Sequence, residues 1–278
     1  MENKSENNAT NTGVVVKTFV IVIAVVSLLV VSVLVNSFLS FDASKLTENE
    51  TQFGMFIKDS LGVKRNGFGT RKYPNGDVYE GDWVDGKWHG KGKLTTSYGD
   101  VYEGDFADGK RNGKGIFTSF YEVYDGDFVD DERTGKGKLT LTDGEVYEGG
   151  FLFGSYHGKG KYTWSSGRIY DGDWEYGIRT GKGRMTFDPD GEFAGDAYEG
   201  DFVDGRFNGN GKYTWSDGQV YDGEWTDDKR NGNGKDIRAS GSIYEGTWID
   251  GKREGVFTVT YSDGTMNTIT YENDSVVR

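Results

Sequence analysis

The chain has 278 residues, of which 44 are Gly, 2 are Pro and none is Cys, and its formal net charge is −13. The lack of Cys excludes disulfides, thiol catalysis and zinc–thiolate sites, and the acidic balance argues against nucleic-acid binding, which needs a basic surface. Gly follows no strict Gly-X-Y period, and aromatic residues make up 15% of the chain, so neither collagen nor a disordered linker fits.

The N-terminal part of the chain predicts a membrane anchor. Residues 1–17 form a polar tail, and residues 18–41 carry no charge and are mostly Val, Ile and Leu. A spanning helix needs about 20 apolar residues, whereas the apolar core of a cleaved signal peptide is about 7–15 residues long. We therefore expect one transmembrane α-helix over residues 18–41, with a cleaved signal peptide as the alternative.

The flanking charges set the expected orientation of this single-pass membrane protein. Lys4 and Lys17 precede the apolar segment, and Lys45 follows it. Because Lys and Arg gather on the cytoplasmic side, the N-terminus is expected in the cytoplasm and the remainder of the chain outside it. Residues 42–61 read as a polar tether.

The rest of the chain is an internal repeat. A Tyr followed by an acidic residue and Gly recurs eight times, at intervals of 22, 23 or 28 residues: Tyr79, Tyr102, Tyr124, Tyr147, Tyr170, Tyr198, Tyr221 and Tyr244. A second aromatic residue comes four positions after each Tyr, and Gly comes eleven positions after it in every unit. Such a fixed period is the signature of a repeat architecture.

These units resemble the MORN repeat (membrane occupation and recognition nexus). The segments YEGDWVDGKWHGKGKLT from Tyr79 and YDGEWTDDKRNGNG from Tyr221 carry the resemblance. It covers residues 62–278 as a leading half-unit and eight repeats. Asp131 and Asp228 replace the turn Gly, and five extra residues lie before Tyr198. The resemblance implies dimeric scaffolds and partner-binding modules.

Period-two alternation predicts the fold of each unit. Tyr, Gly and the second aromatic residue share one face of a strand. Asp-Gly and Ser-Gly dipeptides are expected to form tight hairpin turns: Asp143-Gly144, Ser166-Gly167 and Asp217-Gly218. We therefore expect an all-β protein in which about seventeen strands form one elongated antiparallel meander. The rings of one face are expected to line an open groove for a partner: Tyr79, Trp83, Tyr102, Phe106, Tyr124, Phe128, Tyr147, Phe151, Tyr170, Trp174, Tyr198, Phe202, Tyr221, Trp225, Tyr244 and Trp248.

The opposite face carries alternating charge. The residue after each repeat Tyr is always acidic, and the residue three positions after it is acidic in six units. On the second strand, Lys stands twelve positions after Tyr in five units. Opposite-charge pairs across strands contribute about 0.2–1 kcal/mol each, so this face is expected to be a self-neutralised ladder that fixes strand register.

No enzyme is expected. The only histidines, His89 and His157, are predicted to be turn residues in different units, and Asp188-Pro189-Asp190-Gly191-Glu192 is too short for a calcium loop and reads as an inserted turn. The sequence offers no catalytic, cofactor-binding or metal-binding set, and no cofactor is expected.

Three binding functions follow from the exposed rings. The favoured hypothesis is a membrane-anchored scaffold that binds a protein partner or a second copy of itself, since large apolar patches mark interfaces. The alternatives are cell-wall or carbohydrate binding by the ring stripe and binding of phospholipid head groups. The net negative charge disfavours the last alternative.

Overall fold

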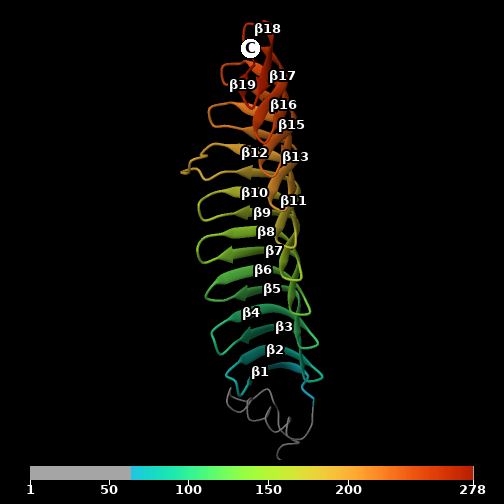
Figure 1. The fold of residues 1–278 in the computed structure, drawn as a ribbon. Coiled ribbons are helices and arrows are strands. Elements are labelled where there is room, and N and C mark those ends of the chain that lie inside the picture. The colour runs from blue at the N-terminus through green and yellow to red at the C-terminus, as the bar shows by residue number, and fades with distance from the viewer. Residues whose placement is uncertain (1–63, 278) are drawn as a thin grey trace, which may run out of the picture. The chain divides into compact units, whose positions relative to one another are not determined.

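A computed structural model describes residues 64–277, which form one antiparallel sheet of 19 strands and contain no helix (Figure 1). Each strand pairs with the next along the chain, as at β1–β2, β2–β3 and β9–β10. The expected all-β meander is confirmed, with 19 strands where about seventeen were expected.

The strands are β1 (Gly67–Lys72), β2 (Val78–Val84), β3 (Lys87–Thr95), β4 (Val101–Ala107), β5 (Lys110–Thr118), β6 (Glu122–Val129), β7 (Glu132–Leu141), β8 (Val146–Leu152), β9 (Ser155–Thr163), β10 (Ile169–Glu175), β11 (Ile178–Thr186), β12 (Ala197–Val203), β13 (Arg206–Thr214), β14 (Val220–Thr226), β15 (Lys229–Ile237), β16 (Ile243–Ile249), β17 (Lys252–Thr260), β18 (Met266–Glu272) and β19 (Ser275–Val276).

The transmembrane helix expected over residues 18–41 lies outside the described residues. Within residues 64–277, no helix is long and apolar enough to cross a membrane.

A continuous row of glycines crosses sixteen consecutive strands, from β1 to β16. Gly81 pairs with Gly69 on one side and Gly92 on the other, and the same pairing repeats along the sheet. We call these residues the glycine row: Gly69, Gly81, Gly92, Gly104, Gly115, Gly126, Gly137, Gly149, Gly160, Gly172, Gly183, Gly200, Gly211, Gly223, Gly234 and Gly246.

The positions of the glycine row require glycine because the rings of the repeat tyrosines lie over them. A Cβ atom on Gly92 would stand 2.4 Å from the Tyr79 hydroxyl oxygen, which no real Cβ atom tolerates. The Tyr79 hydroxyl itself donates to the Asp82 carbonyl, 2.9 Å away. Each ring therefore fills the notch that two missing side chains leave.

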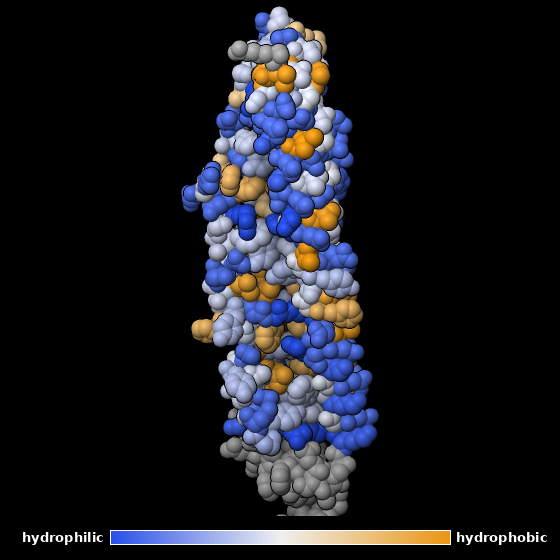
Figure 2. Space-filling view, in the orientation of Figure 1, coloured by the Kyte–Doolittle hydropathy of each residue, from blue (hydrophilic) through white to orange (hydrophobic). Residues whose placement is uncertain are grey.

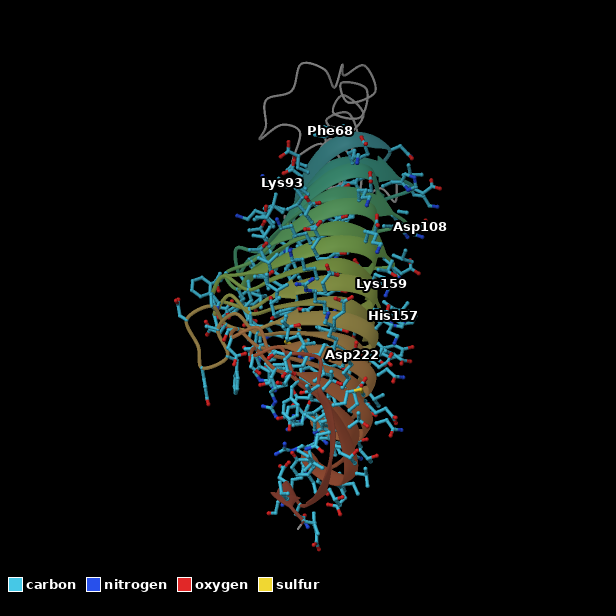
Figure 3. All side chains as sticks on the ribbon, turned by 90° about the horizontal axis from the view of Figure 1, so that it is seen from above. Phe68, Lys93, Asp108, His157, Lys159 and Asp222 are labelled. Atoms are coloured by element: carbon cyan, nitrogen blue, oxygen red, sulfur yellow. The ribbon has the colours of Figure 1, made fainter. Side chains whose placement is uncertain are left out.

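The sheet arches at this row. Within seven of the eight repeat hairpins the strand register shifts directly after a row glycine, as between Gly81 and Asp82 in β2–β3, and in β16–β17 it shifts at Gly246. Such bulges bend a strand. Figure 3 shows the strands arched rather than flat. Since the sheet is one layer thick, we infer that it arches around the rings, because a flat layer could not bury them.

The turns that join consecutive strands differ between the two sides of the sheet. Asp85 and Gly86 both have positive φ, 51° and 79°, as a two-residue type I′ hairpin requires. On the opposite side, three of the turns contain the Asp-Gly and Ser-Gly pairs predicted from the sequence. Only the glycine of each pair has a left-handed backbone, with φ of 92° at Gly144, 90° at Gly167 and 89° at Gly218.

The Asp-Gly turns also join neighbouring units. Gly109 N–H donates to the Trp88 carbonyl of the preceding unit, at 2.9 Å. Asp131 takes the glycine position with φ of 75°, and its Oδ1 accepts the Arg111 N–H at 3.0 Å. The side chain of Asp131 thereby adds a bond between units that glycine cannot make.

Candidate functional site

The face that bears the repeat rings, here called the aromatic face, is closed rather than open. Fifteen of the sixteen rings expected to line a groove are at most 6% exposed, and only Tyr244 is half-buried. The expectation of an open row of rings is corrected by this burial. Period-two alternation identified their shared face, but it carries no information about the arch that encloses them.

The buried rings form a continuous edge-to-face ladder. Tyr79 contacts Trp83 of its own unit, with ring centroids 5.0 Å apart, and Phe106 of the next unit, at 5.2 Å. The same pair of contacts repeats as far as Tyr221 and Trp248, at 5.1 Å. Edge-to-face pairs contribute about 0.5–1.5 kcal/mol beyond their buried area. This ladder is therefore the core of the repeat.

The last unit departs from the pattern because Phe257 replaces a row glycine. Its ring occupies the notch over Gly246 and contacts Trp248 at 4.7 Å and Tyr271 at 5.3 Å. Tyr244 is displaced from the notch, which explains its partial exposure. Phe257 thus carries the ladder on to β18.

Burial changes the acidity of the repeat tyrosines. Desolvation raises the pKa of Tyr79 and of Tyr124 to about 12, because the anionic phenolate loses its water. Neither tyrosine lies beside a nucleophile or a metal-ligating cluster. The described residues hold no group of three or more His, Cys, Asp or Glu side chains that could bind a metal.

A second layer of planar side chains covers the repeat tyrosines. We call it the covering layer; it consists of the residue nine positions after each Tyr: Trp88, Arg111, Arg133, Tyr156, Arg179, Phe207, Arg230 and Arg253. All eight are intermediate in exposure. They are therefore a part of the aromatic face that solvent reaches.

The three rings of the covering layer stack flat on tyrosines. The centroid distances are 4.9 Å for Trp88 on Tyr79, 3.9 Å for Tyr156 on Tyr147, and 3.7 Å for Phe207 on Tyr198.

The five arginines of the layer place their guanidinium groups over the tyrosine rings. Arg133 Cζ lies 4.8 Å from the centre of the Tyr124 ring, and the other four lie at 5.5–5.9 Å from theirs. Trp, Tyr, Phe and Arg share a flat π-face, which is why all of them serve at this position.

Sequence reasoning missed the covering layer because no single residue type fills the position in every unit. The available signal was that each of the eight units carries a planar side chain at the same offset from Tyr. Figure 2 shows the apolar residues of the face in view as small separate patches among hydrophilic ones.

Carboxylates pair with most arginines of the aromatic face. Arg111 Nε lies 3.2 Å from Asp131 Oδ1, Arg133 Nη1 donates to Glu122 Oε2 at 3.2 Å, and Arg253 Nε lies 2.8 Å from Asp274 Oδ1. Asp236 is fully buried and faces Arg230, at 3.6 Å, and Arg238, at 3.0 Å. Burial raises the pKa of Asp236, and both guanidinium groups oppose that shift.

The opposite face, here called the charged face, forms the expected ladder. Lys91 Nζ lies 2.7 Å from Asp105 Oδ1 of the next unit, and the same pair recurs from Lys114, Lys159 and Lys182 at 2.6–2.7 Å. The other oxygen of Asp105 accepts the Lys114 N–H at 3.0 Å, beside the bulge of its own hairpin. These acids therefore hold register and satisfy a bulge donor.

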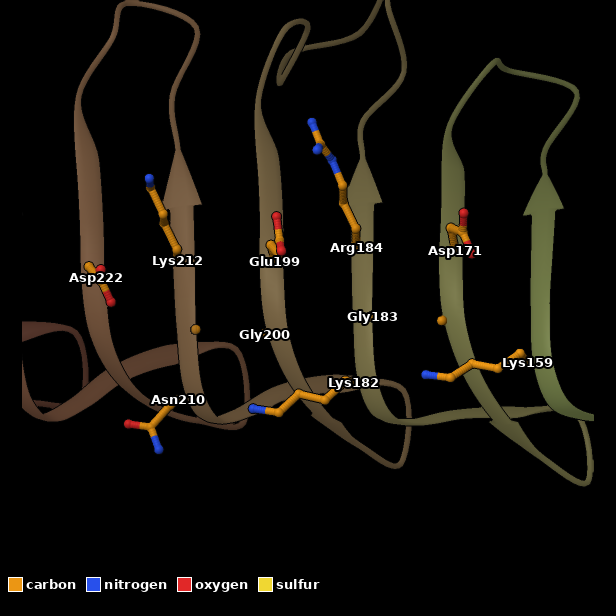
Figure 4. A pocket seen from close by; sticks show the side chains of 12 residues that line it. Lys159, Asp171, Lys182, Gly183, Arg184, Glu199, Gly200, Asn210, Lys212 and Asp222 are labelled. Carbon is orange, nitrogen blue, oxygen red and sulfur yellow. The ribbon is translucent and has the colours of Figure 1, made fainter.

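A broad depression of about 690 Å³ lies on the charged face over β9 to β14 (Figure 4). Glycines of the row form its floor, and charged side chains such as Lys182, Arg184 and Glu199 stand along it. Its lining holds no hydroxyl, thiol or imidazole group. The depression is therefore the strip of strand backbone between two rows of charged side chains, since the side-chain positions of these glycines point to the aromatic face.

The two histidines are not turn residues. His89 lies in β3 and His157 in β9, each directly before a left-handed glycine. The inserted segment is a turn as expected: Asp188 Oδ1 accepts the Asp190 N–H at 2.9 Å, and the Gly191 N–H donates to the Asp188 carbonyl at 3.1 Å.

Comparison with solved structures gives only distant likeness. The TCP10 domain of Danio rerio CPAP has a TM-score of 0.41 and 13% identity, over 76% of this chain and 98% of that one. The SAS-4 (dCPAP) TCP domain of Drosophila melanogaster, in complex with a proline-rich motif of Ana2, has a TM-score of 0.35 and 11% identity, over 73% of this chain and 90% of that one. A comparison with curated protein sequences gives no match.

The model of the MORN repeat family matches nine segments: 64–78, 79–101, 102–119, 124–146, 147–167, 170–192, 198–220, 221–243 and 244–266. They cover more than half of the chain, and eight of them begin at the repeat tyrosines. The recognition of the repeat is confirmed, and the chain belongs to the MORN repeat family.

Proposed function

We propose that this protein is a non-catalytic scaffold that binds a protein partner through the covering layer of its aromatic face. The observation that carries the proposal is the partial exposure of eight planar side chains, one in each repeat, on top of a closed core. The fifteen buried rings then position the covering layer and do not contact the partner themselves.

The composition of the covering layer supports a protein partner. Trp, Tyr and Arg are the residue types enriched among the energetically dominant positions of protein interfaces. Neighbouring strands lie about 4.8 Å apart, so successive units repeat about every 10 Å. A peptide lying along the sheet would meet a new ring or guanidinium at each unit, and a second copy of this chain would meet the same pattern.

The ion pairs of the charged face weigh against phospholipid head groups as the ligand. Lys91, Lys114, Lys159 and Lys182 are each bound to an aspartate, so their charge is neutralised at short range. Glycan binding rests on the stacked rings Trp88, Tyr156 and Phe207 alone, and a protein partner makes use of the arginines as well.

The membrane anchor is the second part of the proposal. Its support is the uncharged segment 18–41 and the lysines before it. We propose that this segment crosses the membrane once and that the repeats lie outside the cytoplasm. Protease treatment of intact cells should remove the C-terminal repeats, whereas their survival until the cells are lysed would reverse the orientation.

The binding proposal is tested by exchanging rings for arginine. The triple variant W88R/Y156R/F207R places Arg where five units already carry it, so its circular dichroism and thermal midpoint should match the wild type. Cross-linking to proteins of the native membrane should lose the partners that wild type captures.

The matched control acts on the other face. A K93A/K138A/K161A variant changes three lysines of the charged face and should retain the partners. Loss of the same partners from this control, with no loss from the ring variant, would assign binding to the charged face instead.

A further inference from the structure

One repeat carries a reversed charge on the aromatic face. The residue two positions before each repeat Tyr shares the face of the ring by period-two alternation. It is acidic in five units and basic in only one: Asp77, Asp100, Glu122, Glu145, Arg168, Asp196, Gln219 and Ser242. Arg168 therefore stands where most units present a carboxylate.

Three of the acids at this position, Glu122, Glu145 and Asp196, bind groups on the second strand of their own unit. Glu122 pairs with Arg133 of the covering layer, and Asp196 Oδ2 accepts the Tyr213 hydroxyl at 2.7 Å. In the unit of Tyr170 the corresponding pair is Arg168 and Arg179. Two positive charges face each other where the unit of Tyr124 has a salt bridge.

Both guanidinium groups lie against one tryptophan. Arg168 Cζ is 4.1 Å from the centre of the Trp164 ring, and Arg179 Cζ is 5.9 Å from it. The loss of water on burial and then the charge of Arg168 lower the pKa of Arg179. The ring face offsets part of this repulsion, as cation–π contacts do.

Neither arginine has a carboxylate within 4.0 Å among residues 64–277. Arg179 Nη2 donates to the Gly205 carbonyl at 2.7 Å, and Arg168 Nε is buried without a hydrogen-bond partner in the same residues. By contrast, five arginines of the aromatic face each face an acid: Arg111, Arg133, Arg230, Arg238 and Arg253.

The inserted segment borders Arg168. It closes a pocket of about 260 Å³ whose lining includes Arg168, Phe187 and Phe193. Asp188 and Glu192 also line it, yet neither forms an ion pair with Arg168. The pocket thus places two apolar rings next to the guanidinium group of Arg168, and Arg179 lies against the same tryptophan, Trp164.

We propose that Arg168 and Arg179 bind the carboxylate of an acidic side chain in the protein partner, and that Phe187 and Phe193 take an apolar side chain beside it. This inference rests on the proposed function. A planar guanidinium matches a carboxylate with two parallel hydrogen bonds. The acidic residue supplies in trans the charge that Glu122 supplies in cis to Arg133.

The test selects random 12-residue peptides on phage against the full chain in detergent micelles. Selected peptides should be enriched in Asp or Glu next to aromatic or aliphatic residues. The variant R168E copies the Glu122–Arg133 arrangement, so it should fold with an unchanged or higher thermal midpoint. It should bind the selected peptides about tenfold or more weakly by fluorescence anisotropy.

Two control variants make the result specific. K136E changes the net charge equally on the charged face, at a lysine that pairs with Gly150 across the strands, and should bind as wild type does. D188N/E192Q removes the acids of the pocket and should bind equally or more tightly, because these two negative charges no longer repel the carboxylate of the peptide.

The outcomes separate the two proposals. Peptides that lack acidic enrichment, or that bind R168E as tightly as wild type, would overturn the role of the arginine pair and leave the scaffold proposal intact. Failure to select any peptide on wild type, together with an unaltered set of cross-linked partners in W88R/Y156R/F207R, would overturn the scaffold proposal itself.

Discussion

Position 92 accepts only glycine. Its φ is not left-handed, so backbone strain does not explain the requirement for glycine. The cause is the Tyr79 ring, whose hydroxyl and Cε2 would lie 2.4 and 2.7 Å from an added Cβ atom. The ring is fully buried and cannot move aside without opening the aromatic ladder.

We predict that G92A destabilises the chain by about 1–3 kcal/mol through overpacking. The measurement is the shift of the urea unfolding curve of the full chain in detergent. K93A, one residue away and pointing to the charged face, should stay within about 0.5 kcal/mol of wild type. Equal stability of G92A and wild type would show that the ring is not held in the notch.

In each hairpin, the spacing of residues along the sequence determines which side chains meet across the strands. In β4–β5 the register shifts between Gly104 and Phe106, and Asp105 stands at the shift. Its two oxygens accept from Lys114 N–H, at 3.0 Å, and pair with Lys91 Nζ, at 2.7 Å. One side chain therefore serves a bulge and joins two repeats.

We predict that D105A costs about 1–3 kcal/mol, because it leaves a strand N–H without its acceptor as well as removing an ion pair. E103A on the same strand removes a pair with Lys93 that spans 3.9 Å at an exposed position, and should cost at most about 1 kcal/mol. Urea unfolding compares the two variants. A larger loss in E103A would contradict the role assigned to the bulge.

At the scale of the whole array, the buried tyrosines couple stability to alkaline pH. Burial raises the pKa of Tyr79 and Tyr124 from 10.0 to about 12 in the folded chain. Below pH 10 both states hold the phenolic protons, so stability does not depend on these groups. Above pH 10 the unfolded state loses protons first, so stability falls as the pH rises toward 12.

We therefore predict that the sheet unfolds between about pH 10 and pH 12, with tyrosinate absorbance at 295 nm rising together with the loss of the circular dichroism of the strands. Neighbour contacts link successive repeats, so the transition should spread along the array. Complete and reversible tyrosinate formation in an intact sheet would contradict the prediction.

Much of the fold could be predicted from the sequence because each repeat contains the residues that make its own contacts. The spacing of Tyr79 from Gly90 and Gly92 predicted strands and hairpins, and Lys91 with Asp105 predicted the ladder that fixes register. These features depend on alternation and fixed offsets, which are properties of the chain itself. The anchor expected over residues 18–41 stays a prediction.

The tertiary structure alone decided which side chains a partner can reach. The rings from Tyr79 to Trp248 were expected to be open, yet the arch at the glycine row encloses them. That arch and the register shift at Asp82 bring Trp88 over Tyr79, and the same geometry brings Arg179 to Arg168. Curvature is a sum over many strands, so no single repeat reveals it, and the accessible surface follows from it.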